Sequence, residues 1–312
     1  MDYFDTVITI TGYEYSQEEF DAVSKETLDL LGEYHRLYTI YHRFDGLENL
    51  CTINELVNGV HRTVKVDCRI IDMLIYAKEM YALTGGVLNI AMGSVLSLWH
   101  DYRTIGKDNP DEASLPPMDK LSAAAQHTDI EKLVIDEQNS TVTLTDPLMK
   151  LDVGAIAKGY ATERVALYLE EKGVTGYVLN VGGNVRTIGT KADGDNWTIG
   201  IENPSGEEYL AYLSLKGESV VTSGSYQRFY YVDGKAYHHI IHPDTLMPAE
   251  NFVSVSIVCQ NSGLGDALST ALFCLTYDDG KELIESISNA EAMWVTKDGN
   301  IIYSDGWKNL EK

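Results

Sequence analysis

Residues 151–160 read LDVGAIAKGY, a strand-like run that leads through a turn into a helix. Gly154 lets the backbone approach a ligand closely, and the helix after it presents free N–H groups that suit an anion. Lys158 adds a positive charge one turn in. The Gly-Lys-Ser/Thr of a P-loop and the Gly-x-Gly-x-x-Gly of a dinucleotide turn are both missing. The stretch therefore suggests another kind of phosphate cradle, or an ordinary strand–turn–helix with a surface lysine.

Helical and strand-like segments alternate irregularly on both sides of this stretch. The expected segments are a strand at 4–10, helices at about 17–42 and 67–85, a hairpin around Asn139, a helix at 155–173, a strand at 177–181 and a helix at 264–275. Three Asp-Gly turns, at Asp193, Asp233 and Asp298, separate alternating runs in the second half. Because regular βαβ alternation is missing, we predict an α+β fold with mixed or antiparallel sheets and packed helices, in two closely joined lobes.

The composition limits the function classes. The chain has 312 residues, 44% of them hydrophobic, and we expect one domain over 1–312, with residues 100–118 as a polar excursion. The net charge is −23, from 47 acidic and 24 basic residues, which argues against nucleic-acid binding. A phosphorylated ligand would need a divalent cation between itself and this protein. The four cysteines form no zinc or redox motif, and no run of 18 apolar residues spans a membrane.

The segment GDALSTA, residues 265–271, places two oxygen-bearing side chains on one helix face. Asp266 and Thr270 are four residues apart, so both point the same way. Two hard oxygens within reach of each other can hold Mg²⁺, which keeps its other positions for water and phosphate. Alternatively, Asp266 caps the helix and Thr270 bonds back to a carbonyl.

A third segment, residues 219–243, gathers histidines. His238 and His242 fall on one strand face and His239 on the other. A metal site from the first two lacks a third ligand, so a single histidine acting as general base is the more economical functional interpretation. Solvated histidines at a strand end are the alternative. A fourth segment, residues 84–99, is either a cover for a planar ring or part of the core.

Taken in this order, the motifs resemble one family: the ApbE family of FAD-dependent flavin transferases, which attach FMN to other proteins. The matching stretches are FDT (4–6), FDGLENLCTIN (44–54), GGVLNIAMGSVLSLW (85–99), LDVGAIAKGYA (151–161), NVGG (180–183), TSGSY (222–226), HIIHP (239–243) and GDALSTALF (265–273). Each is weak alone, but eight in register cover nearly the whole chain.

The resemblance implies a role for individual residues. It implies Mg²⁺ bound by Asp266, Thr270 and the backbone carbonyl of Ala155, and His239 as the catalytic base. The positions implied to contact FAD are Phe4, Phe44, Val87, Leu88, Asn89, Asp152, Lys158, Thr222, Ser223, His239 and Ile240. On this basis the opening stretch resembles a cradle for the FAD pyrophosphate and its magnesium.

The implied reaction is transfer of FMN from FAD to a threonine or serine hydroxyl of an acceptor flavoprotein, a redox-pump or electron-transfer subunit, with release of AMP. We expect the acceptor to be another chain, because no Ser/Thr-Gly-Ala-Thr motif of the target type occurs here. Two alternatives remain open. Water as the nucleophile gives an FAD pyrophosphatase, and a damaged site gives a protein that binds FAD without turnover.

Three positions depart from the family pattern. Leu88–Asn89 replaces Phe-Asp, His242 replaces the Asp of His-Ile-Ile-Asp-Pro, and Phe44 replaces a tyrosine. None of them is an implied magnesium ligand, so they affect substrate detail more than the reaction class. The family is typically exported and lipid-anchored. Since neither a leader nor a lipobox cysteine is found near the start, we expect an extracytoplasmic, membrane-anchored protein if a leader was removed, and a cytoplasmic one otherwise.

Overall fold

The chain divides into two compact units, seen in a computed structural model that describes residues 2–57, 59–206 and 208–312. Unit 1 comprises Met1–His35, Ile156–Gly224 and Asn251–Lys312, and unit 2 comprises Arg36–Ala155 and Ser225–Glu250. Among the described residues, none of the helices has the length and apolar character needed to cross a bilayer.

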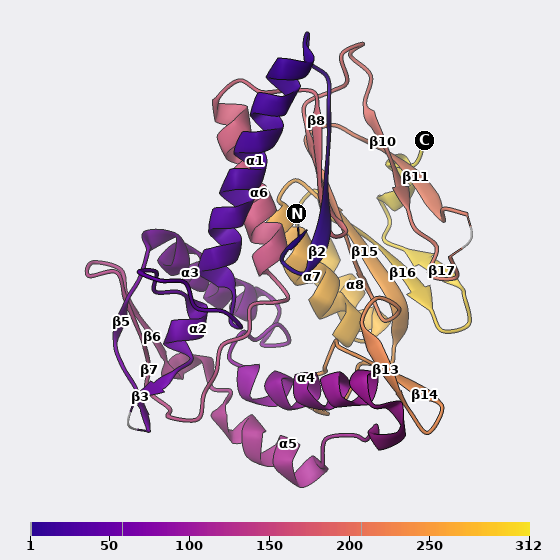
Figure 1. The fold of residues 1–312 in the computed structure, drawn as a ribbon. Helices are drawn as coiled ribbons and strands as arrows, with labels where there is room; N and C mark the ends of the chain where they lie inside the picture. Colours follow the sequence, from indigo (N-terminus) through magenta and orange to yellow (C-terminus); the bar gives the residue numbers. More distant parts are fainter. Residues whose placement is uncertain (1, 58, 207) are drawn as a thin grey trace. The chain divides into compact units, whose positions relative to one another are not determined.

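An eight-stranded sheet organises unit 1, in the order β1-β2-β8-β9-β12-β15-β16-β17, and every neighbouring pair is antiparallel. The strands are β1 (Asp2–Tyr3), β2 (Thr6–Gly12), β8 (Tyr177–Val181), β9 (Asn184–Ile188), β12 (Ser219–Gly224), β15 (Phe252–Cys259), β16 (Glu291–Thr296) and β17 (Ile301–Tyr303). The sheet and its helices are visible in Figure 1. The predicted α+β class with antiparallel sheets is confirmed.

Four helices belong wholly or mostly to unit 1: α1 (Gln17–Tyr38), α6 (Ala157–Glu171), α7 (Ser262–Cys274) and α8 (Tyr277–Glu285). Helix α7 packs against β12 and β15 and also against α6. Small residues make this approach possible: a Cβ added at Gly265 would lie 2.8 Å from a methyl carbon of Val221. Since side chains alternate along a strand, Ser223 faces α7 like Val221, and Thr222 faces away.

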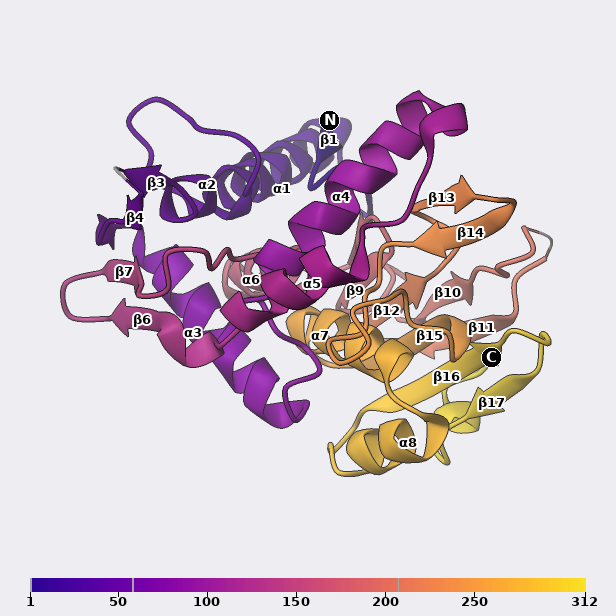
Figure 2. The same ribbon diagram turned by 90° about the horizontal axis from the view of Figure 1, so that it is seen from below.

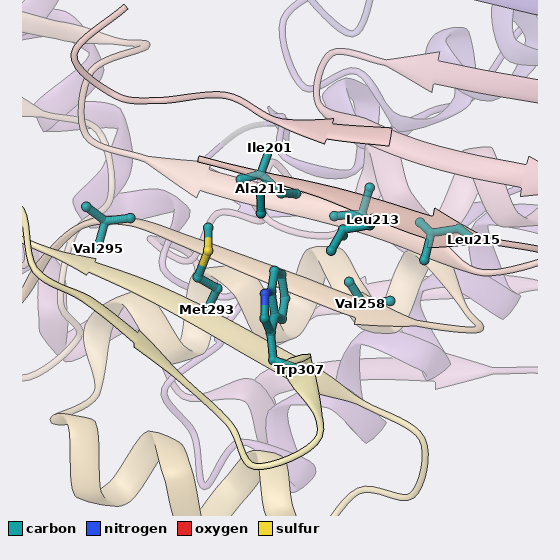
Figure 3. Close-up of a cluster of buried hydrophobic side chains, with 9 residues drawn as sticks. Ile201, Ala211, Leu213, Leu215, Val258, Met293, Val295 and Trp307 are labelled. Atoms are coloured by element: carbon teal, nitrogen blue, oxygen red, sulfur yellow. The ribbon is translucent and has the colours of Figure 1, made fainter. Parts of the chain in front are cut away.

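The opposite sheet face is covered by the hairpin of β10 (Trp197–Ile201) and β11 (Ala211–Leu215), with η4 (Trp307–Asn309) near the end of the chain. Figure 3 shows the apolar cluster between them, with Trp307 at its centre. The cluster consists of Ile201, Ala211, Leu213, Leu215, Val220, Val258, Met293, Val295 and Trp307. Strands β12 and β15 are therefore covered on both faces, which explains why they lack a simple alternation of apolar and polar residues.

Unit 2 combines two longer helices, α3 and α4, with short helices and strands. They are α2 (Leu50–Ile53), β3 (Leu56–Val57), β4 (Val60–His61), β5 (Val64–Lys65), α3 (Cys68–Leu83), α4 (Gly93–Asp108), η1 (Pro110–Glu112), α5 (Met118–Ala124), η2 (Ala125–His127), η3 (Ile130–Lys132), β6 (Leu133–Asp136), β7 (Thr141–Leu144), β13 (Phe229–Val232) and β14 (Lys235–His238). Helix α4 lies beside the β13–β14 hairpin in Figure 2, and α5 packs against α4. Trp99, Tyr230, Leu246 and their apolar neighbours form one core there.

Several predicted elements need correction at their ends. The first helix stops at Tyr38, not at residue 42. The polar stretch 100–118 begins inside a helix, because α4 continues to Asp108. Its Gly106 packs so closely that a Cβ would lie 2.7 Å from the ring of Tyr230. A contact with a strand more than a hundred residues away holds that part of the stretch in place, and local composition does not reveal it.

Candidate functional site

The carboxylate of Asp266 is the centre of a polar group inside unit 1. Its side chain is 5% exposed, and Oδ2 accepts the backbone N–H of Gly159 at 2.8 Å. The ammonium of Lys158 lies 3.5 Å from Oδ1, and the side-chain amide of Asn184 donates to the same carboxylate. Helix α7 begins at Ser262 with Asn261 as its cap, so the alternative in which Asp266 caps the helix is wrong.

Gly159 is the reason that α6 and α7 come together at this carboxylate. A Cβ on residue 159 would lie 2.3 Å from the carbonyl oxygen of Ser262 and 2.5 Å from the Cβ of Asp266. Only glycine allows its own N–H to reach the carboxylate at this spacing. The Lys-Gly pair of the opening stretch therefore serves Asp266 directly: the lysine brings charge and the glycine brings a close backbone donor.

Hydroxyl groups continue the polar surface along α7. The Oγ atom of Ser223 lies 2.8 Å from Oγ of Ser269 and 3.4 Å from Oγ1 of Thr270. Thr222 is directed elsewhere, since its Oγ1 lies 2.7 Å from Oγ of Ser256 on the neighbouring strand. Of the two adjacent hydroxyls implied to contact FAD, the structure brings only Ser223 to α7, because consecutive residues of a strand face opposite sides.

Burial dominates the electrostatics of Asp266. It raises the pKa of the carboxyl above the usual range, while Lys158 and the N–H donors of Gly159 and Asn184 oppose the rise. Burial wins because one lysine at 3.5 Å and two donors replace only part of the lost water. A cation at the carboxylate would add the missing compensation.

The residues present fit a magnesium ion. A carboxylate, a threonine hydroxyl and a nearby amide are hard oxygen donors, and Mg²⁺ is often held by few protein ligands together with water and phosphate. The Oδ1 atom of Asn184 is buried and has no hydrogen-bond partner. In the described part of the chain, no group of three or more His, Cys, Asp or Glu side chains forms a metal cluster. That excludes a carboxylate- or histidine-rich centre there, but not a site with one carboxylate.

Ala155, the third implied magnesium ligand, is the last residue of unit 2 and precedes α6 in the chain. Near it, Asp152 is half-buried, and its Oδ1 accepts the N–H of Gly154 at 2.9 Å. Burial raises the pKa of Asp152, opposed by that N–H and by His100, Arg103 and Arg228. The charges of Arg103 and Arg228 thus act on Asp152 in a protein that is otherwise strongly acidic.

His239 follows β14 and is held by its ring. Its Nδ1 lies 3.2 Å from the backbone carbonyl of Arg228, which can only accept, so Nδ1 carries the proton. Burial and the charges of Arg228 and Arg103 lower the pKa of His239 to about 3. At neutral pH the ring is therefore uncharged, with Nε2 holding the lone pair that a general base needs. The neighbouring Ile240 is buried, and its backbone groups are paired with His238 and Ala249.

The segment that includes Val87, Leu88 and Asn89 belongs mainly to the core of unit 2. Leu88 is buried, Val87 is half-buried, and the amide of Asn89 is used locally. Asn89 donates to the carbonyl of Thr128 at 2.9 Å and accepts the N–H of Ala91 at 2.8 Å. The side chain of Asn89 thus connects two backbone segments. The family's aspartate at this position could accept the N–H of Ala91 but could not donate to the carbonyl of Thr128.

His242 also takes over a local role. Its Nδ1 accepts the N–H of Asp244 at 3.1 Å within a turn in which Leu246 has a positive φ of 60°. An aspartate at this position can accept the same N–H, as in an Asx turn. The turn is therefore kept although the charge is lost, and the departure from the family pattern does not disrupt the backbone here.

The two phenylalanines implied to contact FAD both lie in turns. Phe4 and Asp5 have φ values of 55° and 53° between paired Tyr3 and Thr6, which is the geometry of a type I′ hairpin turn. The Phe4 ring packs edge-on against His35, with 5.5 Å between ring centroids. Phe44 is half-buried and bridges to Leu47. A positive φ is uncommon for a bulky residue, so Phe4 is held by its surroundings.

Sequence reasoning missed two residues of the Asp266 group. Asn184 stands one position beyond the NVGG motif, and Ser269 lies between the two residues read as ligands. For Ser269 a signal existed, because Ser269 is three residues after Asp266 and its Oγ donates to the Asp266 carbonyl. For Asn184 the contact depends on the packing of β9 against α7, which the sequence does not display.

A family model described as the ApbE family matches residues 4–294. This chain belongs to the ApbE family. It is 33% identical over 293 residues to a protein from Klebsiella pneumoniae named FAD:protein FMN transferase, covering 93% of this chain and 86% of that one. A relative of the same name from Treponema pallidum is 33% identical over 258 residues, covering 76% and 69%.

Solved structures agree with this assignment. The ApbE protein of Thermotoga maritima superposes with a TM-score of 0.86 at 28% identity, covering 99% of this chain and 97% of that one. A mutant of the flavin transferase ApbE from Vibrio cholerae gives 0.79 at 25% identity, covering 98% and 96%. The predicted family, fold class and enzyme class of transferase are thereby confirmed.

Proposed function

We propose that this ApbE-family protein transfers FMN from FAD to a threonine or serine hydroxyl of an acceptor flavoprotein, using Mg²⁺ and releasing AMP. Relatives that share a third of their residues carry the name FAD:protein FMN transferase. The observation that carries the proposal is the buried Asp266 carboxylate, with Lys158 at 3.5 Å and the Gly159 N–H at 2.8 Å. It is a compact acceptor for one divalent cation in a protein whose net charge is −23.

In this proposal Asp266 and Thr270, with the carbonyl of Ala155, hold the cation, and Lys158 adds a further positive charge. Bound there, Mg²⁺ would neutralise charge on the pyrophosphate of FAD. Ser223 is hydrogen-bonded to Ser269 and lies near Thr270, and these contacts hold the hydroxyl groups of α7 in place. Most of the rate enhancement would then come from positioning and from compensation of charge.

The bond changes balance without any further reactant. The acceptor oxygen forms a bond to the FMN phosphorus, the bridging P–O bond of the pyrophosphate breaks, and AMP leaves with the bridging oxygen. The hydroxyl proton goes to a base, and neutral His239 with a free Nε2 has the required form. Its pKa of about 3 makes it a weak proton acceptor, so the protonated ring passes the proton to solvent water once the ester has formed.

Water in place of the hydroxyl would turn the same site into an FAD pyrophosphatase. The test incubates the protein with FAD and Mg²⁺, with and without an acceptor flavoprotein subunit. Chromatography measures the AMP that is released. We expect AMP only when the acceptor is present. AMP of equal amount without acceptor would replace the transferase with the pyrophosphatase, and bound FAD without AMP in both tubes would leave a binding protein.

A further inference from the structure

Asn184 is a buried amide beside Asp266 with one half of its hydrogen-bonding capacity unused. It opens β9, is 1% exposed, and donates through its side chain to the Asp266 carboxylate. Its Oδ1 atom has no hydrogen-bond partner. A buried acceptor left without a donor is unfavourable, so a group that satisfies it is expected in the working protein.

The orientation of the amide is fixed by its neighbour. If the amide were turned over, its oxygen would face the carboxylate of Asp266, and two acceptors would oppose each other. Donation to Asp266 therefore keeps Nδ2 on the carboxylate and leaves Oδ1 in the same polar group. The unused oxygen is thus a consequence of the bond to Asp266.

The sheet itself does not need this side chain. The backbone of Asn184 pairs with Val181 of β8 and with Val221 of β12, so the strand is held on both sides by main-chain bonds. For this backbone pairing, an apolar residue of the same size would serve as well. The amide is chemically matched to what lies beside it, a carboxylate that requires a donor and a proposed cation with bound water.

We propose that Asn184 is a positioning residue of the magnesium site: Nδ2 holds the Asp266 carboxylate, and Oδ1 accepts a hydrogen bond from water bound to the cation. Mg²⁺ usually keeps several of its waters, and such a water supplies the O–H donor that Oδ1 lacks. This inference rests on the proposed function, because it requires Mg²⁺ at Asp266.

The test measures binding of Mn²⁺, a paramagnetic substitute for Mg²⁺, to the full chain. Binding is measured by electron paramagnetic resonance in the presence of ADP. Asn184→Leu, of similar size but without donor or acceptor, is expected to weaken Mn²⁺ binding about 10–100-fold. Asn184→Asp keeps the oxygen acceptor but loses the Nδ2 donor, so it is expected to bind Mn²⁺ more tightly than Asn184→Leu.

The matched control is Asn251→Leu, since Asn251 donates to the carbonyls of Cys274 and Leu275 at the far end of α7. It should leave Mn²⁺ binding unchanged. Wild-type affinity in Asn184→Leu would overturn the inference, and Asn184→Ala gives the same decision if the leucine variant does not fold. Absence of Mn²⁺ binding in the wild type would instead overturn the metal proposal together with this inference.

Discussion

Replacement of Gly159 by alanine tests the packing that builds the Asp266 group. The new Cβ would lie 2.3 Å from the Ser262 carbonyl oxygen and 2.5 Å from the Asp266 Cβ, where ordinary contact begins at 3.4 Å. Both clashing atoms belong to α7, so α6 and α7 must separate by about 1 Å. Overpacking of this kind costs about 1–3 kcal/mol of stability. Alanine returns about 0.5–1 kcal/mol of helix propensity, which is the smaller term.

The separation also lengthens the 2.8 Å bond from the Gly159 N–H to Asp266. Since a hydrogen bond to a charged group contributes about 1.5–3 kcal/mol, we expect Gly159→Ala to weaken divalent-cation binding about 10-fold or more. Urea unfolding measures the stability of the variant, and Mn²⁺ titration measures its site. The variant should lose about 1–2 kcal/mol and stay folded.

Gly280→Ala is the matched control for this experiment. Gly280 lies in α8, and its added Cβ would meet Leu272 at 3.5 Å, which is ordinary contact. We expect this variant to be unchanged or more stable by up to about 1 kcal/mol, with normal cation binding. If Gly159→Ala behaved like Gly280→Ala in both assays, the argument that glycine is required for the helix approach would be refuted.

Three further predictions concern other residues. Because the pKa of His239 is about 3, the ring is fully deprotonated at pH 5 and above, so kcat/KM should not fall near pH 6.5 on account of this group. A fall of kcat/KM near pH 6.5 that disappears in His239→Gln would contradict the assignment. Glu163→Ala removes the buried carboxylate that lies 3.1 Å from Arg186 and accepts the Ser262 N–H at 2.7 Å. It should lower the free energy of unfolding in urea by about 3–5 kcal/mol, and a loss below about 1 kcal/mol would refute a structural role for the pair. His242→Asp should keep stability within about 0.5 kcal/mol, since aspartate accepts the same Asp244 N–H, while His242→Ala should lose about 1 kcal/mol; equal losses in thermal unfolding would show that the turn bond is unimportant.

Local chemistry made part of this fold predictable. The hairpin around Asn139 forms as β6 and β7, and the Asp-Gly turn at Asp233 joins β13 and β14, because both depend on residues close in sequence. The shared helix face of Asp266 and Thr270 was equally accessible, since helical spacing alone determines it. These elements were predictable because their partners are neighbours in the chain.

Contacts between distant segments were not predictable in this way. Lys158 and Asp266 are 108 positions apart, and only the packing of α6 on α7 brings them to 3.5 Å. Thr222 points away from α7 because α7 covers the other face of β12. The extension of α4 to Asp108 depends on the packing of α4 against Tyr230. Residue roles that came from the family resemblance alone, such as those of Phe44 and Val87, stay predictions.

The central claim is transfer of FMN to another protein through a cation held at Asp266. Intact-mass spectrometry of an acceptor flavoprotein subunit, incubated with this chain, FAD and Mg²⁺, tests it most directly. We predict that the acceptor gains one covalent FMN with the wild type, and none with Asp266→Ala or with excess EDTA. An acceptor that is flavinylated equally by Asp266→Ala, or left unmodified by the folded wild type while FAD is consumed, would contradict the account.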